Sequence, residues 1–271
     1  MKDKTKKSAA VTITGSFVTL AGLAAAAIGY HQNAGDKITE QDVLIFGGFF
    51  LIIIGLVLFA NGMLRLFSKK APAEYSSAER TRRLAFAALL AALAYIGFQY
   101  FRFDLTVGGE RTAFHLGNTF VVLAALLLGG VWGGMAGALG LTLADFSSGY
   151  ATSAPKTFFL KLCIGLVVGF VAHTLCHLSR AHGAKKIMRI TAAASVCGLA
   201  FNIIADPLVG YFYKQYLFGL PQDIASTLAK LASLTTSVNA VLSAILAVVL
   251  YTALRPALEK SGLFFRLDKE K

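Results

Sequence analysis

The sequence predicts an all-α fold, a polytopic helical bundle that lies in a membrane. Of its 271 residues, 56% are hydrophobic and only 15% are charged, and the mean hydropathy is +0.65. A water-soluble domain does not tolerate so much apolar surface in solvent. The chain also contains repeated apolar runs of about 20 residues, the length that crosses a hydrocarbon core of about 30 Å. We therefore predict eight transmembrane helices.

The predicted helices form a hairpin and a group of six. The hairpin is residues 1–68, with helices near 9–30 and 43–67, and the charged, Ser/Ala-rich segment 69–82 is a cytoplasmic linker. The six-helix membrane domain, 83–256, has helices near 83–101, 116–129, 131–147, 157–178, 187–210 and 234–255, and a cytoplasmic tail, 257–271, follows. Two of these helices meet at the sequence GGVWGG, where Gly129, Gly133 and Gly137 recur every four residues. This spacing predicts close helix contact in lipid.

The basic residues predict the orientation of the helices. Most of the 26 lysines and arginines lie before residue 8, in 65–83, in 179–189 and after 254. Because cytoplasmic loops carry the excess of Lys and Arg, both termini are expected in the cytoplasm, which agrees with an even number of spans. An acidic loop and no small-residue cleavage site follow the first apolar run, so we expect a retained helix there and not a signal peptide.

Several classes of function do not fit the pattern. The net charge of +12 comes from loops between apolar runs and not from a basic face, so topology explains it better than nucleic acid binding. His173 and His177 are four residues apart but have no acidic neighbour, so interfacial histidines are favoured over a metal site. No hydrolase pattern and no phosphate-binding GxxxxGK[ST] loop occurs. We expect neither an enzyme nor a metal or cofactor.

Polar residues inside the apolar runs gather at one depth. With the orientation above, they fall near the outer ends of their helices: His115, Asn118, Asp145, Lys161, Asn202, Asp206 and Asn239. Buried polar groups in lipid are costly unless they meet a partner, water or a ligand. Their common depth predicts a pocket for a small polar molecule that enters from outside, with loop aromatics such as Tyr150 closing over it.

Each of these residues also has a structural interpretation. Asp145 and Lys161 could form an ion pair or reach toward the membrane interface. Asp206 precedes Pro207, so its role could be limited to ending its helix. Asn202 and Asn239 could hydrogen-bond between helices. His115 and Asn118 could cap the helix that follows them.

The segment 114–165 contains a distinctive series of motifs: the HLGN opening, a Gly-rich turn, ALG followed by Asp145, the SGYATSAPKT loop and FFLKLCIG. With these motifs the segment resembles the substrate-binding S component of energy-coupling factor (ECF) vitamin transporters. The resemblance extends over about residues 82–256 and is greatest to the group named for riboflavin uptake.

The resemblance implies a six-helix core that binds a vitamin or vitamin precursor near the extracellular face of a prokaryotic cell membrane. A transmembrane coupling subunit and two ATP-binding subunits would be its partners. By position, the family's pocket corresponds to Phe114, His115, Asn118, Tyr150, Lys161, Asn202, Asp206 and Asn239. The coupling subunit would dock on small residues of the first core helix, Ala87, Ala88, Ala91 and Ala92, although these alanines could equally serve ordinary packing.

The identity of the substrate stays open at this point. Riboflavin, a pyridoxine-like molecule and a pyrimidine precursor all suit an acidic and amide-rich cluster. A self-sufficient secondary carrier would instead show charges at the midplane and an internal repeat. A membrane scaffold or sensor would bind no specific ligand.

Overall fold

The computed structural model describes residues 9–18, 20–22, 24, 76–107 and 110–267. The chain divides into two compact units between Ser76 and Ser77. In the first unit, residues 9–18 and 20–22 are helical. The rest of the predicted hairpin 1–68, including its second helix near 43–67, lies outside the described residues.

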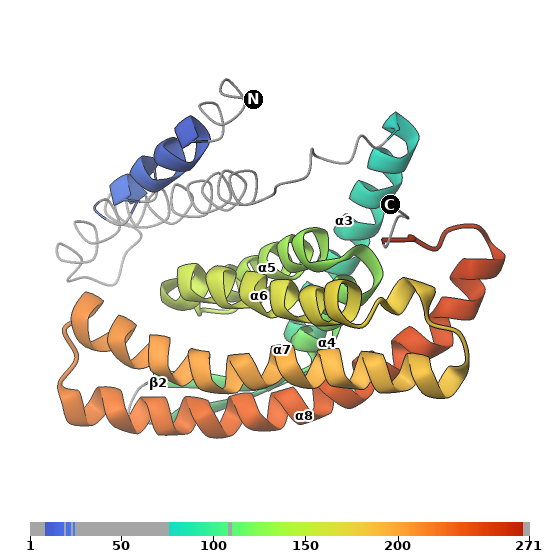
Figure 1. The fold of residues 1–271 in the computed structure, drawn as a ribbon. Helices are drawn as coiled ribbons and strands as arrows, with labels where there is room; N and C mark the ends of the chain where they lie inside the picture. The colour runs from blue at the N-terminus through green and yellow to red at the C-terminus, as the bar shows by residue number, and fades with distance from the viewer. Residues whose placement is uncertain (1–8, 19, 23, 25–75, 108–109, 268–271) are drawn as a thin grey trace. The chain divides into compact units, whose positions relative to one another are not determined.

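The second unit is a bundle of α-helices, as the sequence predicts (Figure 1). Its elements are α3 Ser77–Gln99, β1 Arg102–Val107, β2 Glu110–His115, α4 Gly117–Leu128, α5 Gly130–Ser147, α6 Ala154–Gly169, α7 Ala184–Phe212 and α8 Gln222–Lys260. The helical runs that contain α3, α6, α7 and α8 are long and apolar enough to cross a membrane. The prediction of an all-α membrane bundle is confirmed.

The β-hairpin between α3 and α4 was not predicted. β1 pairs antiparallel with β2, with Arg102 opposite His115 and Val107 opposite Glu110. Its sequence has a signal for this structure, since RFDLTV and ERTAFH contain β-branched and aromatic residues and flank the dipeptide Gly108-Gly109. Two glycines between two such runs are typical of a tight hairpin turn.

Several helix boundaries differ from the predicted ones. α3 begins at Ser77, so the end of the predicted linker 69–82 is helical. α6 ends at Gly169 and continues as a π-helical turn, Phe170–Leu175. α7 and α8 continue through Pro207 and Pro256 to Phe212 and Lys260. Neither proline ends its helix, although each removes one backbone donor, and α7 packs along α8 over much of its length (Figure 1).

The helices expose apolar side chains and bury polar ones, as expected for a protein in lipid. On α8, Val241, Ile245 and Val249 are each more than half exposed, and they recur every four residues on one face. On the opposite face, Asn239 and Ser243 are buried. The exposed apolar face suits lipid tails, and the polar residues are kept within the protein.

Glycines set the distance between the central helices. A Cβ atom on Gly165 of α6 would lie 2.2 Å from the Cα of Gly134 of α5, and one on Gly133 would lie 2.2 Å from the backbone nitrogen of Ala125 in α4. A Cβ atom on Gly137 would lie 2.6 Å from Cγ1 of Val121 in α4. Gly133 and Gly137 therefore have the packing role predicted from their spacing. Gly129 instead joins α4 to α5 with a φ of 86°, a conformation that favours glycine.

The first core helix turns only some of its predicted docking alanines outward. Ala87 is 8% exposed, and the carbonyl of Ala91 lies against Gly140 of α5. Ala88 and Ala92 are exposed. Close packing within the bundle thus accounts for Ala87 and Ala91, and it leaves Ala88 and Ala92 accessible.

The segment after α8 folds back on the start of α3 (Figure 1). Phe265 is 3% exposed and its ring lies edge-on to Phe86, with 5.3 Å between centroids. The guanidinium carbons of Arg82 and Arg83 lie 4.6 and 5.0 Å from the same ring centroid. The predicted cytoplasmic tail 257–271 is therefore packed in place as far as residue 267.

Candidate substrate-binding site

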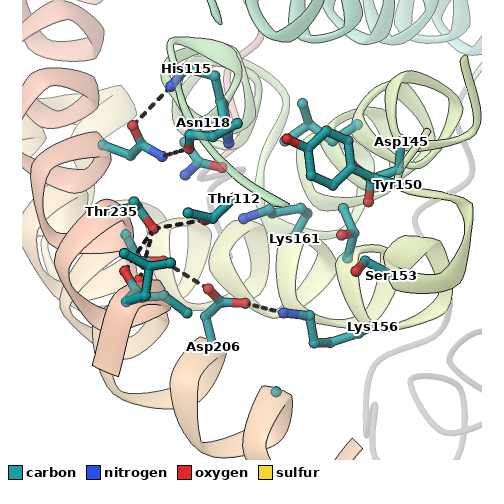
Figure 2. A pocket seen from close by; sticks show the side chains of 18 of the residues that line it. Thr112, His115, Asn118, Asp145, Tyr150, Ser153, Lys156, Lys161, Asp206 and Thr235 are labelled. Atoms are coloured by element: carbon teal, nitrogen blue, oxygen red, sulfur yellow. Dashed lines mark hydrogen bonds and ion pairs between the residues drawn. The ribbon is translucent and has the colours of Figure 1, made fainter. Parts of the chain in front are cut away.

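One cavity lies between the hairpin and the six core helices, α3 to α8 (Figure 2). Seven of the residues predicted from the sequence line it: His115, Asn118, Asp145, Tyr150, Lys161, Asp206 and Asn239. They come from β2, from five helices and from the segment between α5 and α6, which are far apart in the chain. The fold brings them together where α4 begins, α5 ends and α6 begins.

Two predicted residues do not line the cavity. The Phe114 side chain lies on β2 between Ala113 and His115, which both line it, and neighbouring side chains of a strand point to opposite faces. Asn202 is 1% exposed but lies one turn of α7 deeper than Asp206. Neither polar atom of its side chain has a hydrogen-bond partner among the described residues.

The hairpin is fixed to α8 on one side of the cavity. The backbone N–H of His115 donates a hydrogen bond to Oδ1 of Asn239 at 2.9 Å, and Nδ2 of Asn239 donates to the carbonyl of Ala113, also at 2.9 Å. One turn earlier on α8, the hydroxyl oxygens of Thr235 and Thr112 are 3.0 Å apart. Asn239 therefore bonds to a strand and not to another helix, the alternative that the sequence suggested for it.

The hairpin also contacts the segment between α5 and α6. The phenol of Tyr150 donates a hydrogen bond to Asp104 of β1 at 2.9 Å, and Asp104 pairs with Arg102 at 3.0 Å. The ring of Tyr150 lies edge-on to Phe98, with 5.9 Å between centroids. Tyr150 thus connects the segment between α5 and α6 to β1 and to α3.

An ion pair crosses the wall between α6 and α7. Lys156 Nζ lies 2.8 Å from Oδ1 of Asp206, and the Thr236 hydroxyl of α8 donates to Oδ2 of the same carboxylate at 2.7 Å. Asp206 therefore links three helices. Because α7 continues past Pro207, Asp206 does not serve to end its helix.

Three other groups in the cavity keep polar atoms free. Lys161 is 8% exposed and, within the described residues, forms no ion pair shorter than 4.0 Å. Figure 2 shows its ammonium group directed into the middle of the cavity. Asp145 and Asn118 are 5% and 1% exposed, and their Oδ2 and Oδ1 atoms have no hydrogen-bond partner in the part of the chain that the structure describes. The predicted alternative of an ion pair between Asp145 and Lys161 is not formed.

His115 is neutral in this environment. Burial, assisted by the positive charge of Lys161, lowers the pKa of His115 to about 3. Nδ1 accepts a hydrogen bond from the backbone N–H of Gly117 at 3.1 Å, so the proton of the neutral ring lies on Nε2. The interaction orients the ring at the start of α4.

Sequence reasoning missed several polar residues of the wall, chiefly Lys156, Thr112, Thr235, Thr236 and Lys214. Lys156 lies five residues before Lys161, and both belong to the first half of α6. The threonines gave no signal, because hydroxyl residues are common in membrane helices and usually bond to their own backbone. Among the described residues, no group of three or more His, Cys, Asp or Glu side chains could hold a metal ion.

The geometry agrees with a comparison to known protein families. The family model described as "ECF-type riboflavin transporter, S component" matches residues 79–256. The chain belongs to this family. The match spans the six core helices and the hairpin, and thus every residue that lines the cavity. The protein is accordingly a membrane transport subunit of the vitamin-transporter S-component type. No curated protein and no solved structure matches the chain.

Proposed function

We propose that this S component is the substrate-specificity subunit of an ECF-type importer in a prokaryotic cell membrane. The cavity binds a vitamin or vitamin precursor at the extracellular side. A separate coupling subunit and two ATP-binding subunits then drive its delivery inward. The cavity itself is the observation that carries this proposal, because seven polar or aromatic side chains from seven segments converge on it.

Free polar atoms in the wall support binding of a polar solute. A buried polar atom without a partner is costly, and here such atoms occur on Asn118 and Asp145 beside the ammonium group of Lys161. A ligand that carries both hydrogen-bond donors and acceptors supplies the missing partners. Riboflavin, a pyridoxine-like molecule and a pyrimidine precursor are the candidates, since each has both kinds of group around an aromatic ring.

The outer face of α3 is the proposed docking surface for the coupling subunit. Ala88 and Ala92 are exposed and four residues apart, so a partner helix can approach closely there. Ala87 and Ala91 support this face from within the bundle. Replacing Ala88 or Ala92 by Leu should weaken co-purification with a coupling subunit and leave ligand binding unchanged.

Binding to the purified full-length chain tests the proposal. Riboflavin, pyridoxine and the hydroxymethylpyrimidine precursor are added in turn, and the thermal midpoint and the fluorescence of Trp132 and the tyrosines are recorded. We expect one compound, or a close chemical relative of it, to raise the midpoint at micromolar concentration. Binding of no vitamin or precursor below the millimolar range would remove the main support for the transport role.

A further inference from the structure

Side chains of both charges line the cavity. Three lysines line it, Lys156, Lys161 and Lys214, against two aspartates, Asp145 and Asp206. Lys156 and Asp206 neutralise each other at 2.8 Å. The neutral imidazole of His115 does not change this balance. Of the other charged side chains in the wall, Lys161 and Asp145 form no ion pair within the described residues.

Lys161 is the ammonium group best placed to meet a ligand. Its side chain is more than nine-tenths buried, and no carboxylate in the described residues lies within ion-pairing distance of it. In Figure 2 its ammonium group points toward the open space beside Thr112 and Asn118. Keeping a cation buried without a counterion costs free energy, and an anion brought by a ligand recovers that cost.

The carboxylate of Asp145 does not act as the counterion of Lys161. It lines the same cavity, yet it lies beyond ion-pairing distance of Lys161, and its Oδ2 is free. The free Oδ1 of Asn118 is a second acceptor in the wall. The cavity therefore presents one free cation together with two free acceptors, a pattern that matches an anion that also carries hydrogen-bond donors.

We propose that Lys161 recognises an anionic group and that the substrate is a small anionic vitamin or precursor with hydroxyl or N–H donors. The anionic group is a carboxylate or a phosphate. The donors of the substrate bind Asp145 and Asn118. This inference rests on the proposed transport function and narrows it, because the neutral forms of riboflavin and pyridoxine lack the group that Lys161 requires.

Matched pairs of ligands that differ only in the anionic group test the inference. Pantothenate is compared with panthenol, riboflavin phosphate with riboflavin, and pyridoxine phosphate with pyridoxine, each titrated calorimetrically into the purified full chain. We expect the anionic member of one pair to bind about 10- to 100-fold more tightly than its neutral partner, the range for a charge-assisted hydrogen bond. The pantothenate pair reports a carboxylate and the other two report a phosphate.

Variants of the lysine complete the test. Lys161→Gln should remove the preference for the anion, and Lys161→Arg should retain most of it, which also shows that the site still folds. Lys230→Gln is the matched control, since Lys230 is exposed on α8 and does not line the cavity. Equal binding of a neutral partner, or an unchanged preference in Lys161→Gln, overturns the inference but leaves the transport role standing. Binding of no compound in either form counts against both.

Discussion

Asn239 of α8 binds the backbone of the β-hairpin through both ends of its amide, accepting from His115 and donating to Ala113. The two bonds are 2.9 Å long, and the Asn239 side chain is almost fully buried. A strand end has unpaired backbone groups, and a membrane protein must satisfy them internally. Asn239 thus makes it possible for a short hairpin to form one wall of the cavity.

Replacing Asn239 by Ala should loosen that wall. The change leaves one backbone N–H and one carbonyl without partners, and we expect it to lower the free energy of unfolding by about 1–3 kcal/mol. The loss is measured by denaturant unfolding in detergent, and hydrogen exchange should show faster exchange at His115. Asn239→Asp keeps the acceptor for His115 but not the donor for Ala113, so an intermediate loss is expected. Unchanged exchange at His115 in Asn239→Ala would contradict this role.

The ion pair between Lys156 and Asp206 should couple α6 to α7 energetically. In a double-mutant cycle of Lys156→Gln and Asp206→Asn, we expect a coupling of about 1–2 kcal/mol, since both side chains are mostly shielded and share a network. The pair of Arg255 and Glu259 is the control, because the side chain of Glu259 is 48% exposed. Its coupling should stay below about 1 kcal/mol. A coupling at Lys156 and Asp206 no larger than in this control would show that the pair does not hold the helices together.

Much of the site could be predicted because lipid makes polar residues conspicuous. His115, Asn118, Asp145, Lys161, Asp206 and Asn239 stand out in apolar runs, and the placement of basic residues assigned all of them to one depth. The hairpin was missed because its residues lie between two helices in a stretch assigned to a loop, although the repeated glycine at 108 and 109 signals a turn. Asn202 shows the limit of depth as a guide. Contact with the cavity also depends on which face of α7 turns toward it, and depth does not give that face.

Contacts that depend on three-dimensional packing had no counterpart in the sequence. Lys156 gains its importance only because α7 brings Asp206 to within 2.8 Å of it. Likewise, the repeat of alanines on α3 does not reveal which pair faces inward. That distinction comes from Gly140 of α5, against which the backbone of Ala91 rests.

The contact between α5 and α6 should not tolerate even one added methyl group. Gly165→Ala places a carbon 2.2 Å from the Cα of Gly134, so the helices must separate. We expect a loss of about 1–3 kcal/mol in the free energy of unfolding. Gly210→Ala is the matched control, because the nearest atom to its added carbon is Lys156 Nζ at 3.5 Å. Equal stability of the two variants would mean that α5 and α6 pack less closely than described.

The lowered pKa of His115 predicts how stability depends on pH. The native pKa is about 3, and the pKa in the unfolded chain is about 6.5. The unfolded chain therefore binds a proton that the native protein does not as the pH falls below about 6.5, so the free energy of unfolding decreases in that range. His115→Asn cannot take up this proton and should show a smaller decrease between pH 7 and pH 5. Parallel pH profiles for the two proteins would contradict the assignment.

The packed tail should depend on the ring of Phe265. Its burial against Phe86, Arg82 and Arg83 fixes residues 261–267 to the start of α3. Phe265→Ala removes both the apolar contact and the aromatic face that the two guanidinium groups approach. We expect faster hydrogen exchange across 261–267 and little change at the cavity, where exchange at His115 is the reference. Leu263→Ala is the control, because Leu263 is 39% exposed. If both variants exchange alike, the tail is held by its backbone bonds to α8 and not by Phe265.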